Sequence, residues 1–249
     1  MTSTSSSGAV DASTSGVGGA GPPPTDAQGV VSTLCPEIAA ESIVCIGFIN
    51  GHELSAFGLD TGTACTLRTL DTAPYEVSIA AVGTDILYCD PDGVVRAPMM
   101  GGAVESLSVD CGGIFNFGAG VALAPYSQGP VVTFYDSFDD IVTANDTGTA
   151  HLSINAASFA SFGDTIWATE QIATAFYEYI PPDENPVRTV SLGDNDGAVQ
   201  GLAVVDDDTI VFGHPFAIYI IDRMSGQILS EVDVGDLSTP TGLSCYRPL

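Results

Sequence analysis

The chain has 249 residues, of which 31 are acidic and only 5 basic, so its formal net charge is −26. So few cations cannot form the basic surface that follows a nucleic-acid backbone, which excludes a nucleic-acid partner. Hydrophobic residues make up 45% of the chain and charged residues 14%, which excludes a wholly disordered acidic tail. No apolar run approaches the roughly 18 residues that span a bilayer. We therefore expect no insertion of the folded domain into a membrane.

The N-terminal residues 1–29 are almost entirely Ser, Thr, Gly, Ala and Pro. Such a segment buries too little apolar area to offset its conformational entropy. We therefore predict a disordered tether over 1–29 and a folded domain over 30–249. Tethers of this kind commonly lie between a membrane-anchored terminus and a folded domain. No secretory signal pattern follows Met1, which fits a truncated or processed start or a cytosolic protein; we favour the former.

Six cysteines are spread along the chain, and none forms a CxxC pair: Cys35, Cys45, Cys65, Cys89, Cys111 and Cys245. The three histidines lie far from any cysteine pair, so the spacing typical of zinc sites is absent. Six cysteines in an acidic chain without lysine favour up to three disulfides in an oxidising compartment. The alternative is six buried thiols. We predict an extracytoplasmic location, which is periplasmic, at the cell surface or secreted.

From about residue 35, short runs rich in β-branched and aromatic residues alternate with Gly, Pro, Asn and Asp. These runs are typical of strands and occupy 42–48, 75–83, 85–90, 130–136, 165–170, 175–180, 209–213 and 217–222. No stretch keeps a helical apolar period over three turns, so no long helix is expected. The sequence predicts an all-β fold.

The strands recur as a phrase of four parts. It is clear at 199–235, 77–110 and 157–193 and blurred at 113–150, while residues 42–71 hold only its last three parts. The missing first part is the segment TGLSC at 241–245, which matches QGLAV at 200–204. A four-stranded unit that repeats at this spacing indicates a β-propeller.

We predict five four-stranded blades, with the first blade closed by the C-terminal strand. This closure covers the backbone edge that blade 1 would otherwise expose. A sixth blade built partly from 30–41 is the less favoured alternative, because those residues lack a second strand.

The phrases resemble known propeller repeats. The segment DILYCDPDGVVRAPMMGG (85–102) is similar to YWTD-type and related bacterial blades. HELSAFGLDTGTACTLRTL (52–70) and AIYIIDRMSGQILSEVDVG (217–235) resemble PQQ-type and YVTN-type repeats. The resemblance covers roughly 42–245 and implies the fold without fixing a function. Because Trp167 is the sole tryptophan, the repeated Trp motif of quinoproteins is absent, and we predict no cofactor.

The blade alignment also predicts how the cysteines pair. Cys89 ends a second strand and Cys111 follows a fourth strand, so the two lie at the same face of blade 2. Cys45 and Cys65 both belong to blade 1. The remaining pair, Cys35 with Cys245, would then join the two ends of the domain.

Acidic clusters fall at the turns between strands, and carboxylates at turns can bind Ca²⁺. The best candidates are Asp194 and Asp196, in the densest Asp-Asn-Gly turn. No EF-hand loop or nonapeptide repeat accompanies them. The alternative interpretation is that these residues only form tight turns and keep the surface soluble.

His214 is the one weak catalytic candidate, because the Gly213-His214-Pro215 segment follows an inner strand and could reach a central channel. His52 and His151 fit turn or surface positions. A hydrolase or lyase would require carboxylates from several blades beside His214, and no G-x-S-x-G motif is present. We therefore predict a non-catalytic binding or scaffold module for a protein or carbohydrate ligand. A channel-mouth hydrolase or lyase is the alternative.

Overall fold

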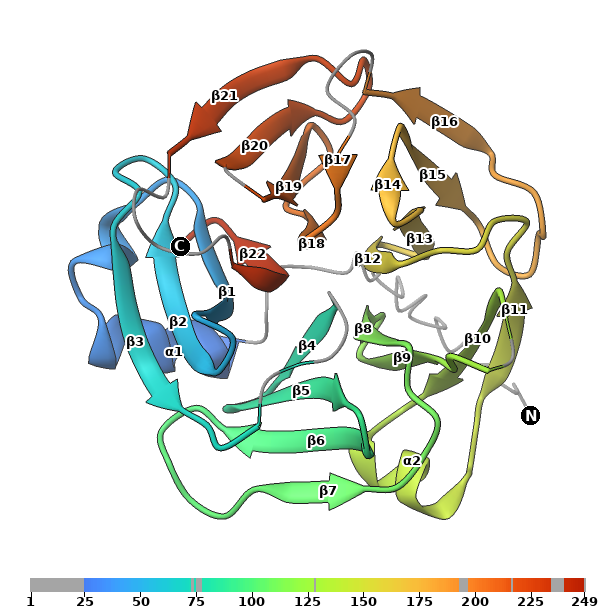
Figure 1. The fold of residues 1–249 in the computed structure, drawn as a ribbon, viewed down its shortest axis with the longest axis horizontal. Coiled ribbons are helices and arrows are strands. Elements are labelled where there is room, and N and C mark those ends of the chain that lie inside the picture. Colours follow the sequence, from blue (N-terminus) through green and yellow to red (C-terminus); the bar gives the residue numbers. More distant parts are fainter. Residues whose placement is uncertain are drawn as a thin grey trace, which may run out of the picture.

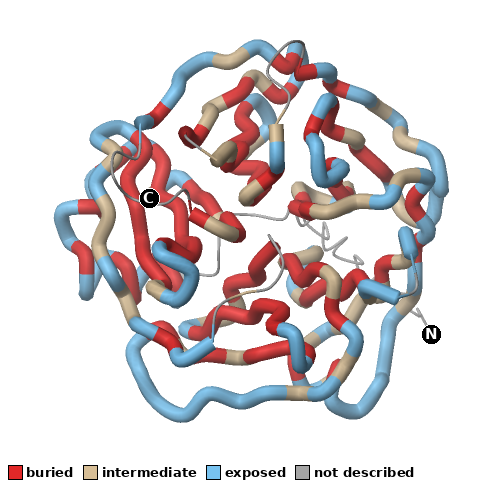
Figure 2. Tube along the Cα trace, viewed as in Figure 1, coloured by how far each residue is buried: buried red, intermediate tan, exposed pale blue. Residues whose placement is uncertain are grey.

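The protein is a five-bladed β-propeller. The computed structural model describes residues 25–72, 74, 78–127, 129–192, 197–215, 217–233 and 240–248. Five four-stranded antiparallel sheets stand around a central axis (Figure 1). Buried residues gather on the inner and middle strands, while the outer strands are largely exposed (Figure 2). The predicted all-β class, strand repeat and number of blades are confirmed.

Each blade runs from an inner to an outer strand. Blade 1 consists of β22 (Thr241–Tyr246), β1 (Val44–Ile49), β2 (Glu53–Gly58) and β3 (Ala64–Thr69). Blade 2 consists of β4 (Ile79–Val82), β5 (Asp85–Asp90), β6 (Gly93–Pro98) and β7 (Glu105–Leu107). Blade 3 consists of β8 (Gly113–Phe117), β9 (Gly120–Ala124), β10 (Val131–Tyr135) and β11 (Gly148–His151). The blurred repeat at 113–150 is thus a complete blade.

Blades 4 and 5 follow the same pattern. Blade 4 consists of β12 (Ser158–Phe162), β13 (Thr165–Thr169), β15 (Ala175–Tyr179) and β16 (Arg188–Ser191). Blade 5 consists of β18 (Gly201–Val204), β19 (Thr209–His214), β20 (Ala217–Asp222) and β21 (Ile228–Val232). The short strands β14 (Ile172–Ala173) and β17 (Gly197–Ala198) pair with each other and join these two blades.

Within the described ranges, three short helices accompany the blades. They are α1 (Thr25–Leu34), the 3₁₀ helix η1 (Ile38–Ala40) and α2 (Phe138–Thr143), which is inserted between β10 and β11. Ser137 caps the start of α2 by accepting a hydrogen bond from the Asp140 amide. Within the part of the chain that the structure describes, no helix is long and apolar enough to cross a membrane.

The tether predicted over 1–29 overlaps a helix. Residues 25–29 form the first half of α1, and residues 1–24 lie outside the described residues. Ala27, Val30 and Val31 follow helical spacing and are buried in the core cluster shared by blades 1 and 2. The prediction placed the boundary too late, because it weighed average composition and missed this apolar face.

The C-terminal strand closes the ring as predicted. β22 pairs antiparallel with β1, so that Cys45 lies opposite Cys245 and Ile46 opposite Ser244. The neighbouring Leu243 is buried in a core cluster that also contains residues of blade 5. One strand therefore completes blade 1 and packs against the blade that precedes it around the ring.

All six cysteines form disulfides, in the pairs Cys35–Cys65, Cys45–Cys245 and Cys89–Cys111. The third pair was predicted correctly, and the predicted pairs Cys45–Cys65 and Cys35–Cys245 are wrong. β2 stands between β1, which carries Cys45, and β3, which carries Cys65. Cys45 instead faces the closing strand. The segment between α1 and η1 brings Cys35 to the outer strand β3, which is why it pairs with Cys65.

The two disulfides with the longest and shortest loops provide a test of ring closure. Cys45–Cys245 spans 200 residues of sequence and Cys89–Cys111 spans 22. In the chain-entropy model, removing the first with Cys45→Ala/Cys245→Ala costs about 2 kcal/mol more than Cys89→Ala/Cys111→Ala. Urea unfolding of both double variants measures the difference. An equal or smaller loss for the Cys45 variant would show that the closure contributes no such constraint.

Candidate functional site at the channel mouth

The innermost strands of all five blades line a narrow central channel of about 40 Å³. Its described lining consists of Ile79, Phe115, Asn116, Phe159, Ala160, Ser161, Ala203, Val204, Leu243, Ser244 and Cys245. These residues include no histidine and no carboxylate. The channel therefore lacks, over its described lining, the His and acid groups that the hydrolase or lyase alternative requires.

Hydrogen bonds tie neighbouring inner strands together across the channel. The Asn116 side chain donates to the Ala81 carbonyl at 2.7 Å and accepts from the Ala81 amide at 2.9 Å. The Phe159 amide donates to the Ser78 hydroxyl at 3.1 Å, which connects blade 4 with the residue before β4. The Phe159 ring stacks on Phe115 with centroids 5.3 Å apart. The channel axis is thus a packed seam that holds blades 2, 3 and 4 in place.

A larger cavity opens at one end of this seam, over blades 3, 4 and 5. Its volume is about 660 Å³, within the range of ~300–1,000 Å³ typical of small-molecule sites. We call it the mouth pocket. It is lined by Gly112, Ala124, Pro125, Tyr126, Gly129, Pro130, Asn155, Ala156, Ala157, Phe159, Gln171, Ala198, Val199 and Gln200. Phe159 borders both the channel and the pocket.

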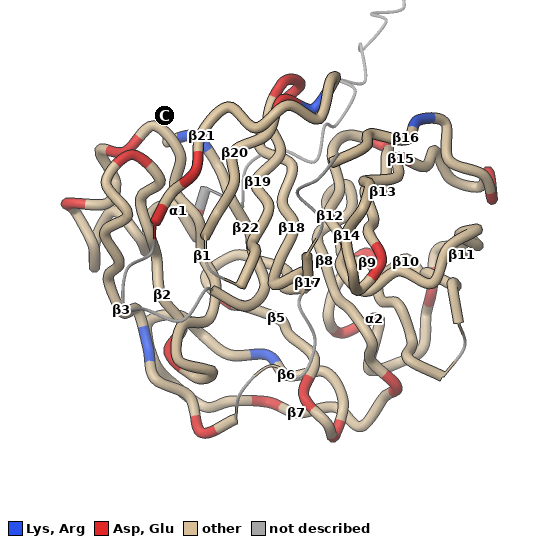
Figure 3. The backbone as a smooth tube through the Cα atoms, turned by 45° about the horizontal axis from the view of Figure 1, so that its top comes forward, with Lys and Arg blue, Asp and Glu red and all other residues tan. Residues whose placement is uncertain are grey.

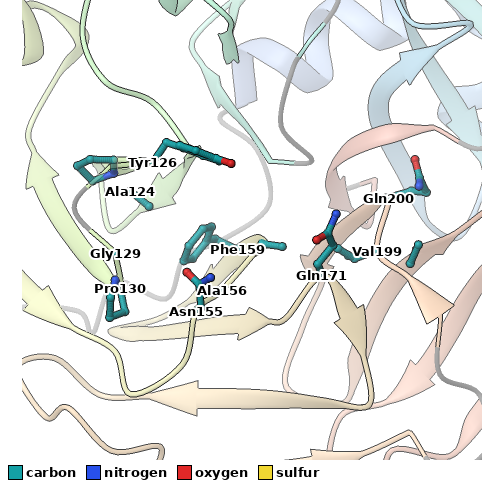
Figure 4. A pocket seen from close by; sticks show the side chains of 14 residues that line it. Ala124, Tyr126, Gly129, Pro130, Asn155, Ala156, Phe159, Gln171, Val199 and Gln200 are labelled. Atoms are coloured by element: carbon teal, nitrogen blue, oxygen red, sulfur yellow. The ribbon is translucent and has the colours of Figure 1, made fainter.

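Tyr126 forms one side of the mouth pocket. Tyr126 is 69% exposed, and its ring extends from blade 3 toward the side occupied by Gln171 and Gln200 (Figure 4). Asp110 anchors this loop by accepting hydrogen bonds from the Tyr126 amide at 3.0 Å and the Ser127 amide at 2.9 Å. The Ser127 hydroxyl also donates to Asp110, and this side-chain bond lowers the pKa of Asp110 below its usual value.

Three amide side chains, of Asn155, Gln171 and Gln200, complete the polar part of the described lining, and hydrogen bonds fix the backbones of the two glutamines. The Gln171 carbonyl accepts from the Val199 amide at 3.1 Å, which joins the segments flanking β14 and β17. The Gln200 amide donates to the Gly213 carbonyl at 2.8 Å, and its carbonyl accepts from Gly242 at 2.7 Å. Asn155 precedes β12 and is exposed. The backbone hydrogen bonds of the blades therefore fix the positions of Gln171 and Gln200.

The histidines lie elsewhere, in three different blades. His214 ends β19, where its ring lies 5.6 Å from that of Tyr219 and so close to β17 that a Cβ on Gly197 would meet it at 2.2 Å. It lines neither the channel nor the mouth pocket. His52 and His151 are exposed, in the β1–β2 turn and in β11. The structure does not bring these three side chains together.

The predicted Ca²⁺ candidates Asp194 and Asp196 lie outside the described residues. Over the ranges the structure covers, one group of possible metal ligands comes close together, namely Cys35, Cys65 and Glu37. Both thiols of that group are consumed by a disulfide. It therefore offers no metal site in this state.

The other acidic turns have structural roles. Asp and Glu lie mostly in connections and outer strands (Figure 3). Asp90 accepts hydrogen bonds from the amides of Asp92 and Gly93, each at 2.9 Å. Asp206 accepts from the Asp208 amide at 2.9 Å and pairs with Arg247 at 2.6 Å. These contacts match the alternative interpretation that such residues form turns.

Sequence reasoning missed the mouth pocket. Its polar residues are one tyrosine and three amides from separate connections, and no motif or spacing links them. The available signal was indirect: Gln200 begins the segment that the repeat aligned with the closing strand. Such a position lies near the axis in a propeller.

No protein-family model matches the sequence, and comparison with curated proteins gives no match. Among solved structures, a chain in the "Crystal structure of Nidogen/Laminin Complex" is similar, with 13% identity, coverage of 84% of this chain and 82% of that chain, and a TM-score of 0.51.

Two further structures are less similar. AztD of Citrobacter koseri has 12% identity, coverage of 82% of this chain and 60% of that chain, and a TM-score of 0.39. The WD40 β-propeller domain of Doa1 has 12% identity, coverage of 77% of this chain and 65% of that chain, and a TM-score of 0.42. The likeness to the nidogen/laminin structure supports the propeller fold alone, and the two lower scores add nothing to it. The particular YWTD-type or YVTN-type family stays a prediction.

Arginine residues are held away from the mouth pocket by acids or carbonyls. Arg223 donates to Glu178 at 3.1 Å, and Arg188 pairs with the other oxygen of Glu178 at 3.3 Å. The Arg223 guanidinium also lies over the rings of Trp167, at 5.1 Å, and Phe162, at 4.7 Å. Glu178 is buried, and the ion cluster that it forms with Arg188 and Arg223 joins blades 4 and 5.

Glu178→Gln should lower the free energy of unfolding by about 3–5 kcal/mol, because it leaves the buried Arg223 with the exposed Asp207, 3.6 Å away, as its remaining described ionic partner. Glu105→Gln is the matched control. Glu105 pairs with Arg96 at 3.8 Å and its side chain is 62% exposed, so its loss should cost less than about 1 kcal/mol. Urea unfolding measures both. Equal losses would show that the Glu178 cluster contributes no more than a surface pair.

Proposed function

We propose that the protein is a binding module, located outside the cytoplasm, that holds its ligand in the mouth pocket over blades 3, 4 and 5. One observation carries the proposal: a cavity of about 660 Å³ combines an exposed aromatic ring with polar amides at the open end of an otherwise packed channel. Concave sites that combine apolar surface with a few fixed polar groups are the usual form of ligand sites.

The chemistry of the lining supports binding. Tyr126 presents an aromatic face and a hydroxyl, a combination favoured at recognition surfaces. The described lining residues supply no imidazole, thiol or carboxylate that could act as a base or nucleophile. The proposed role is therefore recognition of a partner molecule, either a protein or a carbohydrate.

The net charge of the chain limits the chemical class of the ligand. The chain carries a net charge of −26, so anionic polymers and anionic membrane surfaces are repelled over long range. The lining itself contains no arginine to offset that repulsion. A neutral or locally cationic ligand is compatible with this negative electrostatic potential.

The location is supported by the disulfides. All six cysteines of the chain are paired, and structural disulfides persist mainly in oxidising compartments. One of them closes the ring itself. A protein whose architecture is closed by a disulfide fits the periplasm, the cell surface or the extracellular medium.

The test compares three immobilised proteins exposed to an envelope extract of the producing organism: the native chain, Tyr126→Ala/Gln171→Ala, and the control Leu229→Ala/Gln227→Ala. The control also removes one exposed apolar side chain and one exposed amide, but on the outer part of blade 5. Retained proteins are identified by mass spectrometry and retained glycans by monosaccharide analysis.

We expect the native chain and the control to retain a common set of molecules that the pocket variant loses. Removal of an aromatic anchor and an amide contact typically weakens binding by about tenfold or more. Identical retention by all three proteins would show that the mouth pocket binds nothing from that extract and would overturn the proposal.

A further inference from the structure

The mouth pocket is electrically neutral in a strongly acidic protein. The chain has 31 acidic residues, yet none of the described residues that line the pocket is charged. Its polar side chains are the Tyr126 hydroxyl and the amides of Asn155, Gln171 and Gln200. An amide offers two donors and a carbonyl acceptor. The pocket thus presents donors and acceptors without a formal charge.

These amides are available to a ligand. Among the residues whose placement is described, no side-chain hydrogen bond is formed by Asn155, Gln171 or Gln200. The backbones of Gln171 and Gln200 are nevertheless held, since Val199 donates to Gln171 and Gln200 bonds to Gly213 and Gly242. Fixed backbones with uncommitted amides lower the ordering cost of forming new hydrogen bonds.

Apolar surface lies between the amides. Figure 4 shows Phe159 between Tyr126 and Asn155, with Gln171 and Gln200 across from them. Phe159 is 5% exposed and stacked on Phe115, so its position is rigid. Tyr126 contributes a broad exposed ring. A ligand that fits this arrangement needs a flat apolar face and several neutral polar groups around its edge.

We propose, on the basis of the binding function above, that the ligand is a neutral oligosaccharide. A sugar ring has an apolar C–H face, which can pack on Tyr126, and edge hydroxyls that both donate and accept. Those hydroxyls can donate to the side-chain carbonyls of Gln171, Gln200 and Asn155 and accept from their NH₂ groups. An acidic sugar or a nucleotide would bring negative charge toward a chain of net charge −26 without an arginine in the lining to receive it.

A basic peptide is the competing occupant. A second cavity, of about 440 Å³, shares Tyr126 with the mouth pocket and contains Asp90, Asp92 and Asp110. A cationic side chain would be drawn to these carboxylates and away from the neutral amides. Asp90 and Asp110 already accept backbone hydrogen bonds. Asp92 lines this second cavity but not the mouth pocket, where the described polar side chains are Tyr126 and the three amides, and these favour the sugar.

The experiment measures binding of defined probes by saturation-transfer NMR. The sugars are maltotriose, cellotriose, mannotriose, xylotriose, galactotriose and chitotriose. The peptides are acetyl-Gly-Lys-Gly-amide and acetyl-Gly-Asn-Gly-amide. Each is offered to the native chain, to Tyr126→Ala, Tyr126→Phe and Gln171→Ala, and to the control Leu229→Ala/Gln227→Ala. Thermal unfolding of every variant confirms that it is folded.

At least one sugar should bind, with affinity unchanged by added salt because neither partner is charged at the contact. Tyr126→Ala and Gln171→Ala should each weaken it about tenfold, whereas Tyr126→Phe, which keeps the ring, and the control should weaken it far less. A sugar that binds all variants equally overturns the inference, because its site lies elsewhere.

The remaining outcomes separate the two proposals. If no sugar binds but a peptide, or a protein retained from the extract, depends on Tyr126, the ligand class is wrong and the binding function stands. If no sugar, peptide or extract component depends on Tyr126, both proposals fail together.

Discussion

The antiparallel pairing of β22 with β1 is the contact on which the rest of the structure depends. It covers the inner edge of blade 1 and is fastened by Cys45–Cys245. It also places Gly242, with φ +68°, so close to the inner strand of blade 2 that an added Cβ would meet Ile79 at 2.6 Å. The Gly242 amide then donates to the Gln200 carbonyl. One short strand thus contacts blades 1, 2 and 5 at the axis and helps to position a residue of the mouth pocket.

Charge is distributed in a way that leaves the pocket neutral. Carboxylates accept amide hydrogen bonds in turns, as Asp90 does, or pair with arginines, as Glu178 does. Both uses place them in connections or between blades. The axis is filled by residues that pack or form neutral hydrogen bonds, such as Phe115 and Asn116. The described lining at the axis therefore carries no formal charge, and the proposed recognition would depend on Tyr126 and the amides.

The fold could be predicted because each blade repeats a local pattern. The absence of one inner strand before Val44 and its presence at Thr241 were both visible in the sequence, since strand phrases align without knowledge of their partners. The partners of Cys45 and Cys65 were predicted wrongly, because that prediction used blade membership alone and left out β2, which separates the two residues. The mouth pocket was hidden for a different reason. Asn155, Gln171 and Gln200 meet only after the ring closes, and amides at loop positions are common in any β protein.

Amide hydrogen exchange of β22 in the native chain tests ring closure most directly. If the closing strand is part of the cooperative core, the amides of Ser244 and Tyr246 should be protected to the same free energy as those of their partners Ile46 and Val44 in β1. Under native conditions, that free energy should equal the global stability from urea unfolding. Rapid exchange of β22 while β1 stays protected would contradict the account, because the ring would then hold together without its C-terminal strand.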